Sequence, residues 1–233
     1  MSVPAQTLSQ PVPVEVRTGA AIAAPDSTAS EHFRVLLQRL DATGATRPMR
    51  VVAITSSARR EGRTTTAANL ALTAAREGRD VALVECDLRR PTLASLLDLA
   101  PRAGLAEVIE GSAELAQALT TSGTMSVLVA GSARDPAAAL RSPRLATILD
   151  TLRAQFQLVI LDVPPALAFA DAGRLAASAD GAVLVVRAGI TPRQVVRMAI
   201  DSLSPKLVGI VLNDVDATAA VHGRYLYADP AGA

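Results

Sequence analysis

The chain has 233 residues, of which 50% are hydrophobic and 19% are charged, and its formal net charge at pH 7 is +1. This composition excludes a wholly disordered protein, and the small net charge argues against a dedicated nucleic-acid-binding protein, which normally carries a marked basic excess. The length suits one sizeable α/β domain, and the single cysteine, Cys86, excludes a disulfide framework and is expected to be a buried strand thiol.

The first residues are rich in Pro, Val, Thr and Ala, and they lack the basic start and continuous apolar stretch of a signal peptide. No apolar run in the chain approaches the roughly 20 residues needed to cross a bilayer. We therefore expect a cytoplasmic protein in which residues 1–28 form a flexible arm. Contact with a membrane would come only through a partner.

A helix is predicted over residues 29–40, where Thr28 and Glu31 have the spacing of a capping box. The apolar side chains of this segment fall on one helical face: Phe33, Leu36, Leu37 and Leu40. A helix that precedes the sheet could pack on its own domain or on a neighbouring copy of the chain.

Apolar runs of strand length alternate with helix-like segments along the rest of the chain. The expected strands are residues 51–55, 81–85, 126–130, 158–161, 182–186 and 207–212. The expected helices between them include residues 65–76, 142–155 and 191–203, of which the last two open with Ser or Thr followed by Pro. Continuous Val/Leu/Ile runs indicate strands buried on both faces. The pattern predicts a doubly wound, mostly parallel α/β sheet over residues 29–215, with a mobile tail at 216–233.

The first strand runs into a phosphate-binding loop at residues 56–66, which leads directly into a helix. In such a loop, backbone N–H groups and the helix dipole bind phosphate oxygens. Gly62 would let the backbone approach the phosphates, and the Thr64 hydroxyl would ligate Mg²⁺. Arg63 stands where the standard pattern has lysine.

Two later strands end in carboxylates. Glu85 and Asp87 are two residues apart and therefore expected on the same side of the pleat, and Asp162 ends another apolar strand. Parallel strands bring these ends close to the loop, and Mg²⁺ is usually held by one or two carboxylates together with phosphate oxygens and water. The three segments in this order predict a P-loop nucleotide-binding protein.

The combination resembles the bacterial tyrosine kinase family of capsule and exopolysaccharide synthesis, within the MinD/ParA-like superfamily of P-loop NTPases. The matching motifs are the Glu31-x-x-Arg34 helix, the loop, Glu85-Cys86-Asp87-Leu88-Arg89-Arg90-Pro91, Asp162-x-Pro164-Pro165 and Gly209-Ile210-Val211-Leu212-Asn213. They span most of the chain, from about residue 30 to 227.

The resemblance implies an ATP·Mg²⁺-dependent protein-tyrosine autokinase. It places Thr64, Asp87 and Asp162 at the metal, Glu85 as general base, and Asn213 at the adenine, with Arg63 among the catalytic residues. The loop residues implied to bind nucleotide are Arg60, Glu61, Gly62, Arg63, Thr64 and Thr65.

The resemblance also implies phosphorylation of the carboxyl-terminal tail in trans within a homo-oligomer, through a contact made by Glu31 and Arg34. The only two tyrosines of the chain, Tyr225 and Tyr227, lie in this tail. Members without membrane segments are similar to the split type, which depends on a transmembrane polysaccharide co-polymerase as activator. We therefore expect a cytoplasmic protein at the inner face of the membrane.

Several positions depart from the family pattern. Arg59-Arg60-Glu61-Gly62-Arg63 replaces Pro-Gly-Glu-Gly-Lys, Glu85 replaces the commoner Asp, and Leu37 stands where the leading helix has a further arginine. The changes in the loop leave open a nucleotide-binding pseudokinase or adaptor of the polysaccharide machinery. A partitioning or cell-division ATPase is a third alternative, although Ala58 occupies the position of the signature lysine of that class.

Overall fold

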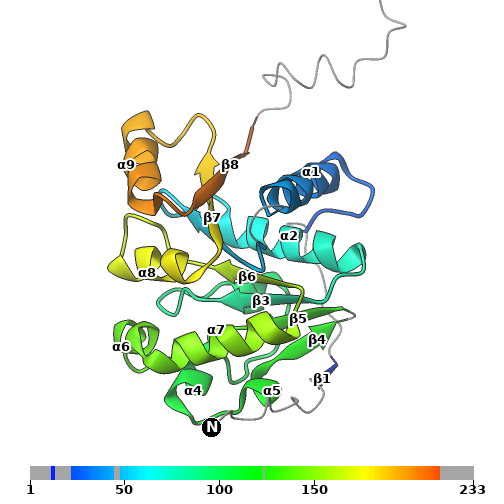
Figure 1. Ribbon diagram of the computed structural model, residues 1–233, viewed down its shortest axis with the longest axis vertical. Coiled ribbons are helices and arrows are strands. Elements are labelled where there is room, and N and C mark those ends of the chain that lie inside the picture. The colour runs from blue at the N-terminus through cyan, green and yellow to red at the C-terminus, as the bar shows by residue number, and fades with distance from the viewer. Residues whose placement is uncertain (1–11, 14–21, 45–47, 123, 216–233) are drawn as a thin grey trace, which may run out of the picture.

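The structure is a computed structural model that describes residues 12–13, 22–44, 48–122 and 124–215. In this part of the chain, eight strands form one sheet in the order β1-β4-β5-β3-β6-β2-β7-β8. The pairing is parallel throughout, except that β4 and β5 are antiparallel. Helices cover both faces of the sheet, which confirms the doubly wound α/β class (Figure 1).

The strands are β1 Val12–Pro13, β2 Val51–Ser56, β3 Val81–Glu85, β4 Thr120–Ser122, β5 Met125–Leu128, β6 Leu158–Asp162, β7 Gly181–Arg187 and β8 Leu207–Asn213. The helices are α1 Thr28–Thr43, α2 Arg63–Arg76, α3 Leu93–Leu96, α4 Leu105–Glu110, α5 Leu115–Ala118, α6 Pro136–Arg141, α7 Pro143–Gln155, α8 Ala170–Ser178 and α9 Arg193–Leu203. All six predicted strands are therefore present, with small shifts at their ends.

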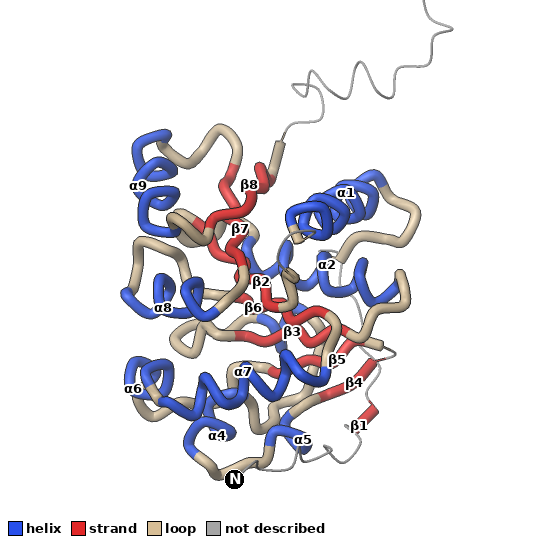
Figure 2. Tube along the Cα trace, viewed as in Figure 1, coloured by secondary structure: helices blue, strands red, loops and turns tan. Residues whose placement is uncertain are grey.

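The sheet separates two apolar cores because successive side chains of a strand point to opposite faces. Val51 and Ala53 of β2 pack in a core with α7, α8 and α9, whereas Val52 and Ile54 pack in a core with α1 and α2. Figure 2 shows these helices on opposite sides of the sheet. The central strands are buried on both faces, which explains their unbroken apolar sequence.

Three predicted helix starts were wrong. Ser27, not Thr28, is the N-cap of α1, and its side chain accepts a hydrogen bond from the Ser30 amide. Helix α2 begins at Arg63, two residues before the expected start. Helix α9 begins at Arg193 after Pro192, so Thr191 does not cap it. The prediction for α7 is confirmed, because Ser142 caps it and Pro143 occupies its first turn.

The leading helix α1 packs on its own domain. Leu37 is 1% exposed and lies in the core that contains α2. This confirms the first alternative for the helix, packing on its own domain. The expected arm falls mostly outside the described residues, and the expected tail does so entirely. Within the described part, no helix is long and apolar enough to cross a membrane.

The order of the strands in the sheet determines where the candidate site lies. Strand β6 lies between β3 and β2, and Asp162 is in register with Glu85 on one side and with Ile54 on the other. Because these three strands are parallel, their carboxyl ends meet at one edge of the sheet. The loop after β2 and the carboxylates after β3 and β6 are therefore neighbours.

Candidate functional site

The loop between β2 and α2 contains two residues in the left-handed backbone region. Arg60 has a φ of 62° and Gly62 a φ of 89°. A left-handed conformation costs a non-glycine residue roughly 1–2 kcal/mol, so the arginine at position 60 is accommodated at an energetic cost. The positive φ of Gly62 favours glycine, and a Cβ atom at this position would lie 2.0 Å from Asn213 Nδ2, so a larger residue would strain the backbone and displace the Asn213 side chain.

The side chain of Glu61 holds the loop in shape from the inside. Glu61 is buried, and its carboxylate accepts hydrogen bonds from the Ala58 amide at 2.8 Å and from the Thr191 hydroxyl. Asn213 Nδ2 donates to the Glu61 carbonyl oxygen at 3.0 Å. Two of the predicted nucleotide-binding residues, Glu61 and Asn213, thus make their side-chain contacts with the loop or with Thr191. The contact of Thr191 with Glu61 could not be predicted from the sequence, because it depends on the packing of β7 beside β2.

The two aspartates lie together, as predicted, and they share one cation. Arg63 Nε donates to Asp162 Oδ1 at 2.7 Å, and Arg63 Nη2 donates to Asp87 Oδ2 at 2.8 Å. The side chains of Arg63, Asp87 and Asp162 are 11%, 8% and 0% exposed, respectively. The site is therefore a nearly buried three-residue ion network at the start of α2.

The environment of Asp162 is set by burial and by its neighbours. Burial raises the pKa of Asp162 above its ordinary value, while the charge of Arg63 and the hydroxyl of Thr64 act in the opposite direction. Its second oxygen, Oδ2, is buried and has no hydrogen-bond partner of normal geometry in the described part of the chain. A buried carboxylate oxygen without a partner is an available ligand position.

Magnesium fits this residue set. Two carboxylates and one hydroxyl, from Asp87, Asp162 and Thr64, are hard oxygen donors at a phosphate-binding loop, and Mg²⁺ normally adds phosphate oxygens and water to such a set. The unpartnered Asp162 Oδ2 supports the assignment. The Arg63 guanidinium, however, is bonded to both aspartates in this state.

Glu85 makes different contacts from Asp87, although the two are only two residues apart. Its carboxylate is fully buried and accepts hydrogen bonds from the amides of Thr92, of Leu93 at 2.7 Å and of Ala130 at 3.1 Å. These bonds join the end of β3 to α3 and to the segment after β5. In this state, Glu85 positions the backbone around the site.

We expect the stability of the protein to depend on pH through Glu85. Burial raises the pKa of Glu85 above its ordinary value of 4.5, and the three amide hydrogen bonds only partly offset this effect. The folded chain then binds this proton more tightly than the unfolded chain. Stability is therefore lost as the pH rises from 4.5 through the raised pKa.

The measurement is urea denaturation of the wild type and of Glu85→Gln from pH 4 to 8. The unfolding free energy of the wild type should fall relative to that of the variant, by at most about 1.4 kcal/mol per pH unit. Glu77→Gln, at an exposed position, controls for the loss of a surface carboxylate. A difference between wild type and Glu85→Gln that is constant or rises with pH would contradict the expectation.

A second cluster beside the site was not predicted. Arg89 pairs with Asp171 at 2.8 Å and stacks 4.4 Å from the centroid of the Phe169 ring. Asp171 is the second residue of α8, whose N-cap is Phe169. Arg89 thus ties the segment after β3 to the start of α8. Cys86 is buried, as expected, although it lies directly after β3 rather than within the strand, and burial raises the pKa of its thiol.

The remaining predicted residues lie apart from the ion network or outside the described chain. Thr65 lies in the first turn of α2, where its carbonyl oxygen accepts from Asn69 Nδ2. Glu31 and Arg34 pair with each other at 2.7 Å on the exposed side of α1. Tyr225 and Tyr227 lie outside the described residues, so their role stays a prediction.

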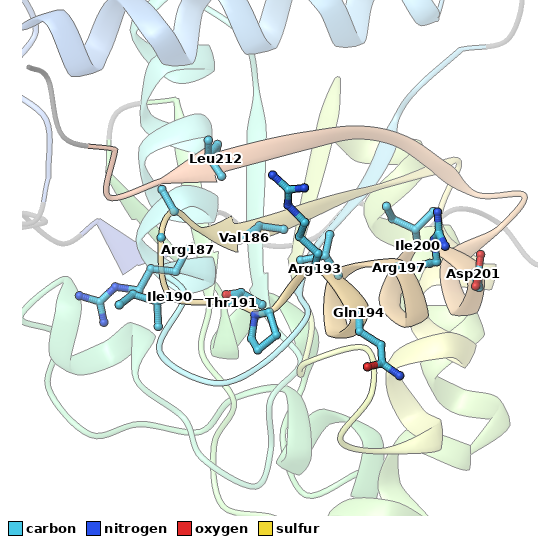
Figure 3. A pocket seen from close by; sticks show the side chains of 14 residues that line it. Val186, Arg187, Ile190, Thr191, Arg193, Gln194, Arg197, Ile200, Asp201 and Leu212 are labelled. Atoms are coloured by element: carbon cyan, nitrogen blue, oxygen red, sulfur yellow. The ribbon is translucent and has the colours of Figure 1, made fainter. Parts of the chain in front are cut away.

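A groove with a volume of about 1170 Å³ lies elsewhere on the molecule, between α9 and the β7–β8 edge of the sheet. Figure 3 shows Arg193 extending from the start of α9 toward Leu212 of β8. Neither Asp87 nor Asp162 lines this groove. It therefore adds no group to the ion network.

The chain is similar to curated proteins over most of its length, although no family model matches it. It is 35% identical to Tyrosine-protein kinase YwqD of Bacillus subtilis over 199 residues, which cover 83% of this chain and 84% of that protein. It is 28% identical to Tyrosine-protein kinase CpsD of Streptococcus agalactiae, covering 84% and 87% of the two chains. It is also 30% identical to the Succinoglycan biosynthesis transport protein ExoP of Rhizobium meliloti, covering 91% of this chain but 28% of that protein.

Several solved structures have the same fold as this chain. The chimerical protein CapA2B2 superposes with a TM-score of 0.79 at 25% identity, covering 88% of this chain and 93% of that chain. The kinase domain of Escherichia coli tyrosine kinase ETK gives a TM-score of 0.79 at 27% identity, covering 84% and 79%. The septum site-determining protein MinD of Pyrococcus horikoshii, complexed with Mg-ADP, gives 0.58 at 24% identity, covering 70% and 69%, which shows a common P-loop NTPase fold.

Proposed function

Because this chain belongs to the bacterial tyrosine kinase family, we propose that it is an ATP-dependent protein-tyrosine autokinase that regulates capsular or exopolysaccharide synthesis and export. The observation that carries the proposal is the meeting of the phosphate-binding loop with Asp87 and Asp162 at one edge of the sheet. The MinD neighbour that carries Mg-ADP has the same fold, which supports nucleotide and magnesium as cofactors.

Each residue of the site has a proposed role. The loop amides from Arg60 to Thr65 would hold the phosphates, with Gly62 allowing their close approach, and Asn213 would lie beside the adenine. Thr64, Asp87 and Asp162 would hold Mg²⁺, which neutralises charge on the phosphates when it is bound. The cation of Arg63 would move from the aspartates to the phosphates.

A role for Glu85 as general base has a structural requirement. A base must lie within hydrogen-bond reach of the hydroxyl that it deprotonates. The Glu85 carboxylate is buried and bonded to three backbone amides, so it would have to leave them first. The geometry supports Glu85 more strongly as a positioning residue than as the base.

The proposed acceptors are Tyr225 and Tyr227. We expect wild-type protein incubated with its membrane activator, Mg²⁺ and γ-labelled ATP to incorporate label on tyrosine. Replacing both residues with phenylalanine should remove the label, because the chain has no other tyrosine. The thermal unfolding of the double variant should match that of the wild type, which would show that the label was lost with the hydroxyls.

Label that survives the double replacement would place the acceptor on another residue type. Absence of label from the wild type, with and without the activator, would contradict the kinase proposal itself. If the unlabelled wild type still binds ATP with Mg²⁺, its function is that of a nucleotide-binding adaptor that transfers no phosphate.

The proposed partner is a transmembrane polysaccharide co-polymerase that recruits the chain to the cytoplasmic face of the membrane. The relation to ExoP supports it, because this chain matches 28% of a longer protein named for succinoglycan biosynthesis transport. We propose in addition a homo-oligomer with Glu31 and Arg34 at its contact. Their position on the exposed side of α1 is compatible with that role.

One observation favours a second candidate function, a nucleotide-binding adaptor of the same machinery that transfers no phosphate. Arg63 replaces the lysine of the family loop and is bonded to both metal-site aspartates. Phosphoryl transfer depends on accurate placement of such charges, so it is more sensitive to this change than binding is. Nucleotide binding without tyrosine label would identify this function.

A further inference from the structure

The guanidinium of Arg63 occupies the carboxylate oxygens that a metal ion would need. One edge of the group, Nε and Nη2, donates to Asp162 Oδ1 at 2.7 Å and to Asp87 Oδ2 at 2.8 Å. With its side chain 11% exposed, Arg63 is largely shielded from water. Charge-assisted hydrogen bonds of this length are among the stronger polar contacts in proteins.

The arrangement depends on arginine in particular. A guanidinium presents adjacent N–H groups along a rigid planar edge, and it can therefore bridge two carboxylates at once. A lysine ammonium is a compact point charge on a flexible stem and has no such edge. Arg63 is the first residue of α2, immediately after Gly62, so its side chain starts beside the aspartates.

Metal and guanidinium cannot share these oxygens. Both are cations, and two positive charges within a few ångströms repel strongly in a poorly hydrated site. Among the four carboxylate oxygens, Asp162 Oδ2 is buried and lacks a partner of normal geometry, while Asp87 Oδ1 accepts from the Arg90 amide at 3.2 Å. A metal ion would therefore find one available oxygen until Arg63 leaves.

We propose that Arg63 is the resting occupant of the magnesium position and excludes divalent cations from the nucleotide-free protein. The proposal rests on the proposed nucleotide and magnesium site. The nucleotide phosphates offer Arg63 new anionic partners, and its departure frees Asp87 and Asp162 for the metal. Metal and nucleotide consequently bind with positive coupling, and by linkage each tightens the other by the same factor.

The test uses the full chain and Mn²⁺ as a paramagnetic probe that accepts the same oxygen ligands. Free Mn²⁺ is measured by electron paramagnetic resonance during titration without nucleotide. We expect Arg63→Ala to bind Mn²⁺ at least about ten-fold more tightly than the wild type, because two unpaired carboxylates remain. Arg59→Ala removes one exposed charge from the same loop and should stay within about two-fold of the wild type.

The reciprocal experiment adds ADP. ADP should tighten Mn²⁺ binding to the wild type by at least about ten-fold, and this factor should be clearly smaller in Arg63→Ala. Circular dichroism melts establish that each variant is folded. If Arg63→Ala does not fold, Arg63→Lys takes its place, and a gain in Mn²⁺ affinity of at least about three-fold without nucleotide is expected.

Equal Mn²⁺ affinity of the wild type and the folded Arg63 variant would overturn the proposal, as would equal coupling to ADP in the two proteins. A separate titration of a fluorescent ADP analogue with Mg²⁺ distinguishes this failure from that of the proposed function. Normal analogue binding with unchanged Mn²⁺ affinity refutes only the role of Arg63. Absence of analogue binding from the folded wild type refutes the nucleotide site, and this inference with it.

Discussion

Replacing Asp162 with asparagine is expected to reduce tyrosine phosphorylation by at least about 100-fold, the loss typical of removing one element of electrostatic stabilisation from an active site. Asp162 is fully buried, bonded to Arg63 and next to Thr64. An asparagine keeps the shape of the side chain but removes the charge that would hold the metal. The measurement is the rate of label transfer from ATP to the tail tyrosines with saturating Mg²⁺.

Loss of activity must be separated from loss of the fold. The Asp162→Asn change leaves the nearly buried Arg63 with one charged partner fewer, and removing one partner of a buried ion pair is typically destabilising by about 3–5 kcal/mol. Thermal melts are therefore recorded beside the activity. Asp87→Asn, at a less enclosed position, should lose activity with a smaller change in stability, and Asp150→Asn on the exposed side of α7 should change neither. A folded Asp162→Asn protein with undiminished label would show that this carboxylate is not part of the reaction.

Replacing Arg63 with lysine is expected to increase tyrosine phosphorylation by about ten-fold. The lysine ammonium cannot bridge Asp87 and Asp162 along a planar edge, so both carboxylates become available to Mg²⁺. The shorter, more adaptable cation can also follow the phosphate through the reaction, and catalysis is sensitive to displacements of about 1 Å. Initial rates of label incorporation at equal protein and activator concentrations measure the effect.

Arg59→Lys provides the matched control, because it makes the same chemical change at an exposed position of the loop. It should leave the rate within about two-fold of the wild type. A rate that falls in Arg63→Lys would mean that the natural site is adapted to arginine. Label in neither protein, with nucleotide bound by both, would favour the adaptor function.

The spacing of the motifs was sufficient to predict that the loop and the two aspartates meet at one edge of the sheet. Gly62, Thr64, Asp87 and Asp162 were all predicted from strand–loop–helix spacing and from carboxylates at strand ends, and the structure brings the two aspartates together. Arg60, which stands where the family pattern has glycine, has a φ of 62° and lies in the left-handed region that glycine favours. These features depend on contacts within a few residues or on the general geometry of parallel sheets. Both can be inferred from the order of the motifs along the chain.

The partners of individual side chains could not be predicted in the same way. Glu85 and Asp87 share a side of the strand pattern, yet Glu85 bonds to amides of Thr92, Leu93 and Ala130. Thr191 contacts Glu61, which is 130 positions away in the chain. Such contacts depend on which loops pack together and, at position 85, on the extra methylene group of glutamate relative to aspartate. Neither produces a periodic pattern in the sequence.

The alternation of buried strands and helices, the doubly wound sheet and its phosphate-binding loop could all be predicted from the sequence, because apolar runs and the order of short motifs are local properties of the chain. The position of β6 between β3 and β2 depends on tertiary packing, and so does the reach of the Arg63 guanidinium to Asp162, the last residue of β6, and to Asp87, two residues after β3. An ion network requires charged groups from distant segments to lie within a few ångströms of one another. In a nearly buried site, water cannot compensate for a missing partner, so the packing of these segments determines which charges pair.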